Sequence, residues 1–120
     1  MTEWLLPIRL VSEGNIHEHW TKKHKRHKQQ QILINSMANT TIRPILPVLV
    51  ILTRISPRKL DDDNLQYAFK SLRDYIADYL IPGLKLGRAD NDPRITWQYK
   101  QQKGKPHAVK IQFIETFSLD

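Results

Sequence analysis

Residues 61–83 read DDDNLQYAFKSLRDYIADYLIPG, and this stretch decides the fold because it holds the clearest helical pattern in the chain. Its apolar side chains recur at the i, i+3, i+4 and i+7 spacing of a helix that buries one face. They are Leu65, Ala68, Phe69, Leu72, Ile76 and Leu80. Residues 61–64 are typical of a helix start, and Pro82-Gly83 is typical of a stop. We therefore predict an amphipathic helix here.

The residues around this helix predict strands. Residues 48–52, VLVIL, form a continuous β-branched run, which is typical of a strand buried on both faces in the middle of a sheet. Alternation of apolar residues at 6, 8 and 10 predicts a first strand that ends at the turn residues 12–15, SEGN. Alternation also marks residues 95–99 and 109–113. Because the Gly-containing turn QQKGKP separates these two runs, we predict that they form a β-hairpin.

A second helix is expected between the first two strands. Residues 18–39 contain no Gly or Pro, and Trp20, Ile34 and Ala38 fall near one helical face. The expected fold class is therefore α/β, more narrowly α+β, with a small mixed, largely antiparallel sheet of about four strands. Two main helices would pack on that sheet within a single domain, residues 1–120.

Composition restricts the class of protein. The chain has 120 residues, no cysteine and a net charge of +7. The absence of cysteine excludes disulfides and thiolate metal sites, whereas the excess positive charge favours nucleic acid as a partner. The longest apolar run is too short to span a bilayer, and we see no signal-peptide core. We expect a cytoplasmic protein with no membrane partner.

Three consecutive carboxylates, Asp61, Asp62 and Asp63, have an ordinary explanation. Acidic residues at a helix start accept backbone hydrogen bonds and meet the positive end of the helix dipole, each worth about 0.3–1 kcal/mol. One aspartate serves as the cap and a second still gains from the dipole. The third adds repulsion with little left to satisfy.

A second acidic pair, Asp90 and Asp92, stands just before the strand that begins near Ile95. If that strand and the strand of residues 48–55 are antiparallel neighbours, both acidic clusters meet at one edge of the sheet. Gathered carboxylates raise one another's pKa, and a hard divalent cation reverses that penalty. In a basic protein this arrangement indicates Mg²⁺-assisted cleavage of a phosphodiester.

Lys70 is the cation that helical spacing brings nearest. It follows Asp63 by nearly two turns, with Gln66 toward the same side, and all three lie away from the apolar stripe. Lys70 could therefore reach a phosphate. The alternative is a solvated lysine paired with Asp74 at i+4.

The stretches LDDDNLQYAFKSLRDYIAD and DNDPRITWQYKQQKGKPHAVKIQF resemble the RusA-type Holliday-junction resolvases, especially the prophage-like members. The resemblance covers about residues 51–113 and rests on the Asp-x-Asp-Asn-Leu motif at residues 61–65 together with the later acidic motif. It implies a homodimeric, Mg²⁺-dependent endodeoxyribonuclease. Such an enzyme resolves four-way DNA junctions by paired nicks in recombination and repair.

Site residues follow from the same resemblance. Asp61 and Asp63 match the two motif aspartates, and Asp92 matches the later catalytic aspartate, with Asp90 as a nearby metal-ligand candidate. The family's lysine position, one turn after the second motif aspartate, is Tyr67 here. Lys70 is the substitute that geometry offers.

The densest basic run lies in the first helix and is expected to contact DNA phosphates without reading sequence. The proposed DNA-binding residues are Lys22, Lys23, Lys25, Arg26, Lys28, Arg58 and Lys59. A solvated helix face is the alternative. We reject a metal site at His24 and His27, because these two histidines have no nearby carboxylate or thiolate.

Two other functions compete with junction cleavage. In the first, the chain is a non-catalytic, basic nucleic-acid-binding phage regulator, and the acidic run is only a helix start. In the second, it is a metal nuclease for flaps or RNA.

Overall fold

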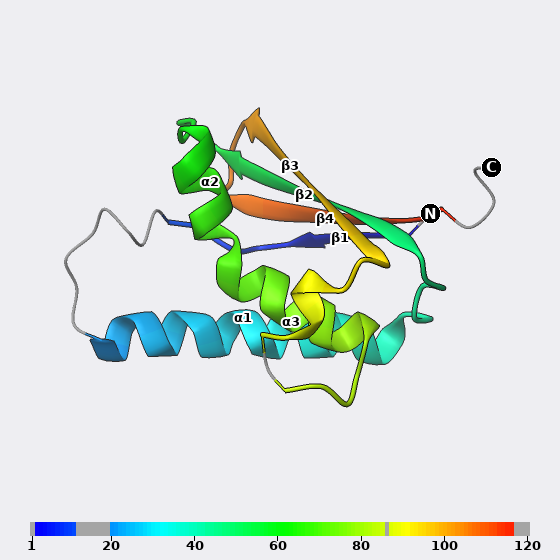
Figure 1. The fold of residues 1–120 in the computed structure, drawn as a ribbon. Helices are drawn as coiled ribbons and strands as arrows, with labels where there is room; N and C mark the ends of the chain where they lie inside the picture. The colour runs from blue at the N-terminus through cyan, green and yellow to red at the C-terminus, as the bar shows by residue number, and fades with distance from the viewer. Residues whose placement is uncertain (1, 12–19, 86, 117–120) are drawn as a thin grey trace.

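The structure, a computed structural model, describes residues 2–11, 20–85 and 87–116. Its elements are β1 (Thr2–Leu6), α1 (Trp20–Thr40), β2 (Val48–Ser56), α2 (Asp62–Ala68), α3 (Lys70–Leu80), the 3-10 helix η2 (Ala89–Asn91), β3 (Ile95–Lys103) and β4 (Ala108–Glu115). Figure 1 shows α1 and α3 side by side on one side of a four-stranded sheet. The predicted fold class, a small mixed sheet with helices packed on it, is confirmed.

The helix predicted from residues 61–83 forms as two consecutive helices that meet at Phe69. The Phe69 ring is fully buried, and its backbone N–H is shared between Leu65 O at 3.3 Å and Gln66 O at 3.2 Å. The chain changes direction at this point, so α2 leans toward the ends of β2 and β3 while α3 follows α1 (Figure 1). Lys70 therefore begins a new helix instead of continuing the first.

The sheet has the strand order β1-β4-β2-β3. β2 lies between two neighbours, as its continuous apolar run predicts. The expectation that β2 and β3 are antiparallel is wrong, because they pair in parallel from Val48 with Ile95 to Ser56 with Lys103. The physical reason is the intervening α2–α3 segment, which carries the chain back along the sheet before β3 begins.

The predicted β-hairpin is also wrong. β3 and β4 do not pair with each other, because β2 lies between them and bonds to both. The turn residues step over the end of β2, where Gly104 N–H donates to Ser56 O at 3.1 Å. The alternating pattern identified two strands correctly, but it contains no information on which strand is the partner.

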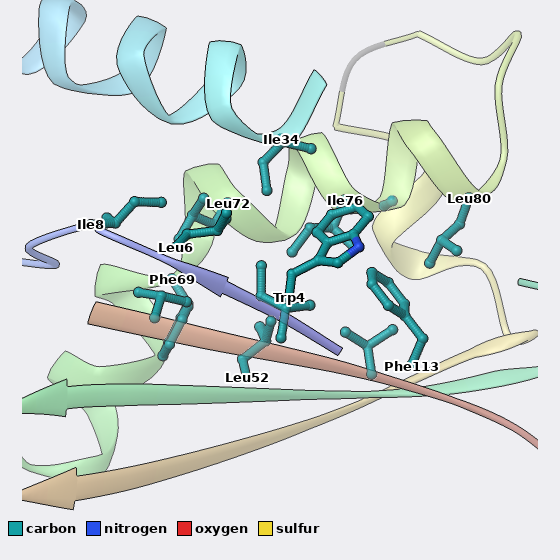
Figure 2. Close-up of a cluster of buried hydrophobic side chains, with 14 of the residues drawn as sticks. Trp4, Leu6, Ile8, Ile34, Leu52, Phe69, Leu72, Ile76, Leu80 and Phe113 are labelled. Atoms are coloured by element: carbon teal, nitrogen blue, oxygen red, sulfur yellow. The ribbon is translucent and has the colours of Figure 1, made fainter. Parts of the chain in front are cut away.

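The core lies between the sheet and the helices. Trp4 packs its ring on Phe113, with centroids 4.8 Å apart, and Figure 2 shows both beside Leu72 and Ile76 of α3 and Ile34 of α1. All of these side chains are at most 1% exposed, so removing one leaves a cavity. This core fixes α3, and with it the side chains that α3 turns away from the sheet.

The first strand lies earlier in the chain than predicted, at Thr2–Leu6 instead of around residues 6–10. β1 ends at Leu6, and Pro7, which has no N–H to donate, follows it. Ile8 and Leu10 still bury their side chains, although they lie outside a strand. The predicted turn at residues 12–15 lies outside the described residues.

Candidate active site

Asp61 is the N-cap of α2. Its Oδ1 accepts the backbone N–H of Asn64 at 2.8 Å, and its Oδ2 accepts the Asn64 side-chain amide at 3.0 Å. Both carboxylate oxygens therefore have partners inside the protein. Asp62 and Asp63 follow in the first turn of α2 and are exposed. Of the three consecutive carboxylates, Asp61 has the ordinary structural role that the sequence allowed.

Asp63 borders an open groove of about 300 Å³ that we call the acidic groove. It is lined by Asp63, Gln66, Tyr67, Lys70, Arg73, Asp90 and Tyr99. These residues come from α2, α3, η2 and β3. The structure thus brings Asp63, Lys70 and Asp90 to one groove, and it confirms that Gln66 lies on the same side as Asp63 and Lys70.

Asp90 is held in place by Arg73. Asp90 Oδ2 is 3.3 Å from Arg73 Nε, too poorly aligned for a hydrogen bond. A second guanidinium nitrogen of Arg73 donates to the Asp90 backbone oxygen at 3.1 Å. The other carboxylate oxygen, Oδ1, is buried and has no hydrogen-bond partner. A buried anionic oxygen without a hydrogen-bond partner calls for an explanation, and a bound water or ion is one of them.

Asp92 is engaged differently. Arg94 donates to Asp92 Oδ1 through its backbone N–H at 2.9 Å and through Nε at 3.0 Å, and to Oδ2 through a terminal nitrogen at 3.0 Å. These hydrogen bonds lower the pKa of the Asp92 carboxyl to about 2. Asp92 therefore closes a local turn before β3.

The structure does not bring Asp63 and Asp92 together, contrary to the expectation from the sequence. β2 and β3 are parallel, so Asp61 follows one end of this strand pair and Asp92 precedes the other. Nine paired residues separate those ends by about 26 Å. Asp90, on the turn that packs against α3, reaches the acidic groove instead.

Arg73 is a site residue that the sequence analysis missed. Its guanidinium carbon lies 4.7 Å from the centroid of the Trp97 ring, and a terminal nitrogen donates to Tyr99 Oη at 2.8 Å. Trp97 Nε1 also donates to the Asp90 backbone oxygen at 3.0 Å, and this hydrogen bond helps to hold the turn that carries Asp90. The sequence contained a signal for Arg73, because it follows Lys70 by three residues and so lies on the same side of the helix.

Asp74 and Asp78 extend the negative charge along α3. Burial raises the pKa of the Asp74 carboxyl, the negative charge of Asp90 raises it further, and Lys70 and Arg73 act in the opposite direction. Burial and the charge of Asp90 also raise the pKa of Asp78. Lys70 therefore interacts favourably with Asp74, as the alternative for this lysine anticipated, while it also lines the acidic groove.

A second groove, of about 290 Å³, joins this region to α1, and we call it the helix groove. Its lining residues are Lys23, His27, Tyr67, Lys70, Ser71, Asp74 and Tyr75. Tyr67 and Lys70 line both grooves, so the helix groove, which α1 borders, and the acidic groove are neighbours. Trp20, at the start of α1, is 70% exposed.

The remaining predicted DNA contacts are distributed over the surface. Lys22, Lys25 and Lys28 are exposed on α1, and Arg26 is half-buried. Arg58 and Lys59 are exposed just after β2. Because α1 carries these cations around its circumference, Lys23 is the member of the basic run that faces the helix groove.

The carboxylates fit Mg²⁺ only in part. Among the described residues, no three His, Asp or Glu side chains are grouped so that they could hold a metal ion. Mg²⁺ usually takes only one or two carboxylates and completes its shell with water and substrate phosphate. Asp63 and Asp90 line the same groove, whereas Asp61 and Asp92 have both carboxylate oxygens engaged within the chain.

No family model, curated protein or solved structure matches the chain. None of the described helices is both long enough and apolar enough to cross a membrane.

Proposed function

We propose that this chain is a Mg²⁺-dependent, structure-selective endodeoxyribonuclease that nicks four-way DNA junctions as a homodimer. The observation that supports the proposal is that Asp63, Asp90 and Lys70 line one groove, and that Lys70 also lines the neighbouring groove with Lys23 of α1. Carboxylate oxygens suit a hard cation, and lysine side chains attract a phosphate backbone. The sequence resemblance to the RusA-type resolvases supports the choice of junction DNA as substrate.

Several side chains of the two grooves then have a role in binding the DNA or the metal. Lys23 and His27 attract the backbone to the helix groove, and Lys70, where the two grooves meet, contacts the phosphate to be cut. Asp63 and Asp90 would hold Mg²⁺ with that phosphate. When bound, Mg²⁺ supplies an activated water and neutralises charge on the phosphate. Arg73 keeps the Asp90 carboxylate oriented.

A Mg²⁺ titration with an end-labelled synthetic four-way junction tests the proposal. We expect nicking that requires the divalent ion, and a loss of about 100-fold or more in the single-turnover rate for Asp63→Asn. Asp62→Asn is the matched control, because Asp62 is exposed on the same helical turn but does not line the acidic groove. A parental rate in Asp63→Asn would show that the site is assigned wrongly. Flap, duplex and RNA substrates in parallel identify the preferred structure.

The same assay separates the two later aspartates. We expect Asp90→Asn to lower the rate as strongly as Asp63→Asn, and Asp92→Asn to lower it less, because the Asp92 oxygens bind Arg94. If Asp92→Asn instead lowers the rate more than Asp90→Asn does, Asp92 is the catalytic aspartate that the resemblance implies.

A non-catalytic nucleic-acid-binding protein is the second candidate. The observation in its favour is that Asp61 caps α2 and Asp92 pairs with Arg94, so two of the four expected carboxylates have both oxygens hydrogen-bonded within the chain. Such a protein binds junction DNA but produces no nicks at any Mg²⁺ concentration, however much of it is added.

A further inference from the structure

Arg54, on β2, is a buried cation to which no described carboxylate provides a counter-charge. It is 8% exposed, and its side chain donates to two backbone carbonyl oxygens, Leu10 O at 3.2 Å and Arg58 O at 2.6 Å. Among the described residues, no carboxylate contacts it. Because moving a charge out of water is costly, buried cations are normally paired with an anion. Neutral carbonyls leave the positive charge of Arg54 uncompensated.

A second arginine intensifies that charge. Burial lowers the pKa of the Arg54 guanidinium, and the positive charge of Arg9 lowers it further. Arg9 is exposed and comes from the segment that follows β1. Two like charges held together repel each other, so an anion placed between them would be stabilised by both.

Arg9 and Arg54 line the same groove, about 390 Å³ in volume, which we call the arginine groove. Arg58 and His107 also line it, and no Asp or Glu does so among the described residues. The Nδ1 atom of His107 is buried and has no hydrogen-bond partner. The groove therefore combines three guanidinium groups with an imidazole nitrogen that has no partner, and it lacks the acidic side chains of the acidic groove.

The positive lining continues along α1. Arg9 and Val11 also line a neighbouring groove of about 480 Å³, which Lys22 and Lys25 border from α1. Lys23, by contrast, faces the helix groove. The start of α1 is thus flanked by two different surfaces, one with carboxylates and one whose described charged lining residues are all cations.

We propose that Arg9, Arg54, Arg58 and His107 bind a backbone phosphate of a nucleic-acid strand that the protein holds but does not cut. Arginine forks suit phosphate oxygens, and backbone contacts of this kind carry no sequence preference. Lys22 and Lys25 extend the contact to neighbouring phosphates of the same strand. This inference deepens the proposed function, since the strand would be a second arm of the DNA whose cleaved phosphate lies beside Lys70.

The test is the salt dependence of junction binding in EDTA, measured by fluorescence anisotropy with a labelled four-way junction. Each phosphate contact contributes about 0.9 to the slope of log affinity against log salt. We expect the Arg9→Gln/Arg58→Gln double variant, which weakens the contact to that one phosphate most, to lower the slope by up to about 0.9, and each single variant to lower it by less. Lys85→Gln is the matched control, since Lys85 is exposed and borders neither groove. An unchanged slope in the double variant would overturn the proposal.

Two further arms identify the source of the phosphate and keep this inference separate from the nuclease proposal. Inorganic phosphate is titrated while the His107 imidazole is followed by NMR. If phosphate shifts the His107 signals but Arg9→Gln leaves DNA binding unchanged, the arginine groove binds free phosphate, and the proposal that it binds a nucleic-acid strand is wrong. Binding is measured in EDTA and needs no cleavage. If Arg9→Gln lowers the salt slope but the protein never nicks DNA, the nuclease proposal is wrong and the phosphate site in the arginine groove still stands.

Discussion

Asp90 and Asp92 stand two positions apart and have opposite environments. Asp90 keeps one oxygen buried without a partner, whereas Asp92 is bound by Arg94 at both oxygens. The sequence showed two nearby carboxylates and could not rank them, because their difference depends on where η2 turns. Asp90 lies within η2, which packs against α3, whereas Asp92 follows η2 and accepts hydrogen bonds from the nearby Arg94.

The Asp92 carboxyl should titrate at a pKa of about 2 in a carboxyl-carbon NMR experiment. The hydrogen bonds from Arg94 favour its charged form. Since the folded pKa lies below the ordinary value, this contribution to stability is present above about pH 4 and is lost as the pH falls toward 2. Arg94→Gln should raise the pKa toward the ordinary 3.8. An Asp92 that titrates near 3.8 in the parental protein would contradict the Arg94 pairing.

At the scale of elements, the start of α2 holds two aspartates with different surroundings: Asp61 caps the helix, and Asp63 lines the acidic groove. Asp61→Ala should lower the free energy of unfolding by about 1 kcal/mol, because the backbone N–H of Asn64 loses its acceptor. Asp61→Asn should nearly retain stability, since asparagine caps helices as well as aspartate does. Urea denaturation of both variants measures this. Equal losses in the two variants would mean that the charge of Asp61, and not the cap, stabilises α2.

The helices and the strands could be predicted from the sequence because each depends on local periodicity. The stripe from Leu65 to Leu80 predicted the helical region, although not its division into α2 and α3, and the apolar run at 48–52 predicted β2. Pairing depends on distant residues, and there the prediction failed. A helix between two strands was itself a signal for parallel pairing, and it would have placed Asp61 and Asp92 at opposite ends of the strand pair. The arginine groove carried no local signal, because Arg9, Arg54 and His107 come from three separate segments.

For the whole molecule, the acidic side chains of α3 and η2 should make stability depend on pH. Burial and the charge of Asp90 raise the pKa of Asp78. The folded state therefore binds its proton more readily than the unfolded state, so this contribution favours folding at low pH and is lost as the pH rises through the folded pKa. Asp78→Asn should accordingly unfold at a higher temperature than the parental protein at pH 7. The difference should vanish below pH 3.8, where Asp78 is protonated in both states. An Asp78→Asn protein that is less stable at pH 7 would contradict this account.

The pairing of β1 with β4 has a consequence for how the protein is made. The register joins Thr2 to Phe113 and Leu6 to Val109, so β1 cannot pair until β4 has been synthesised. Trp4 and Leu6 therefore lack their native strand partner through most of the translation of this domain, and the sheet can be completed only at a late stage.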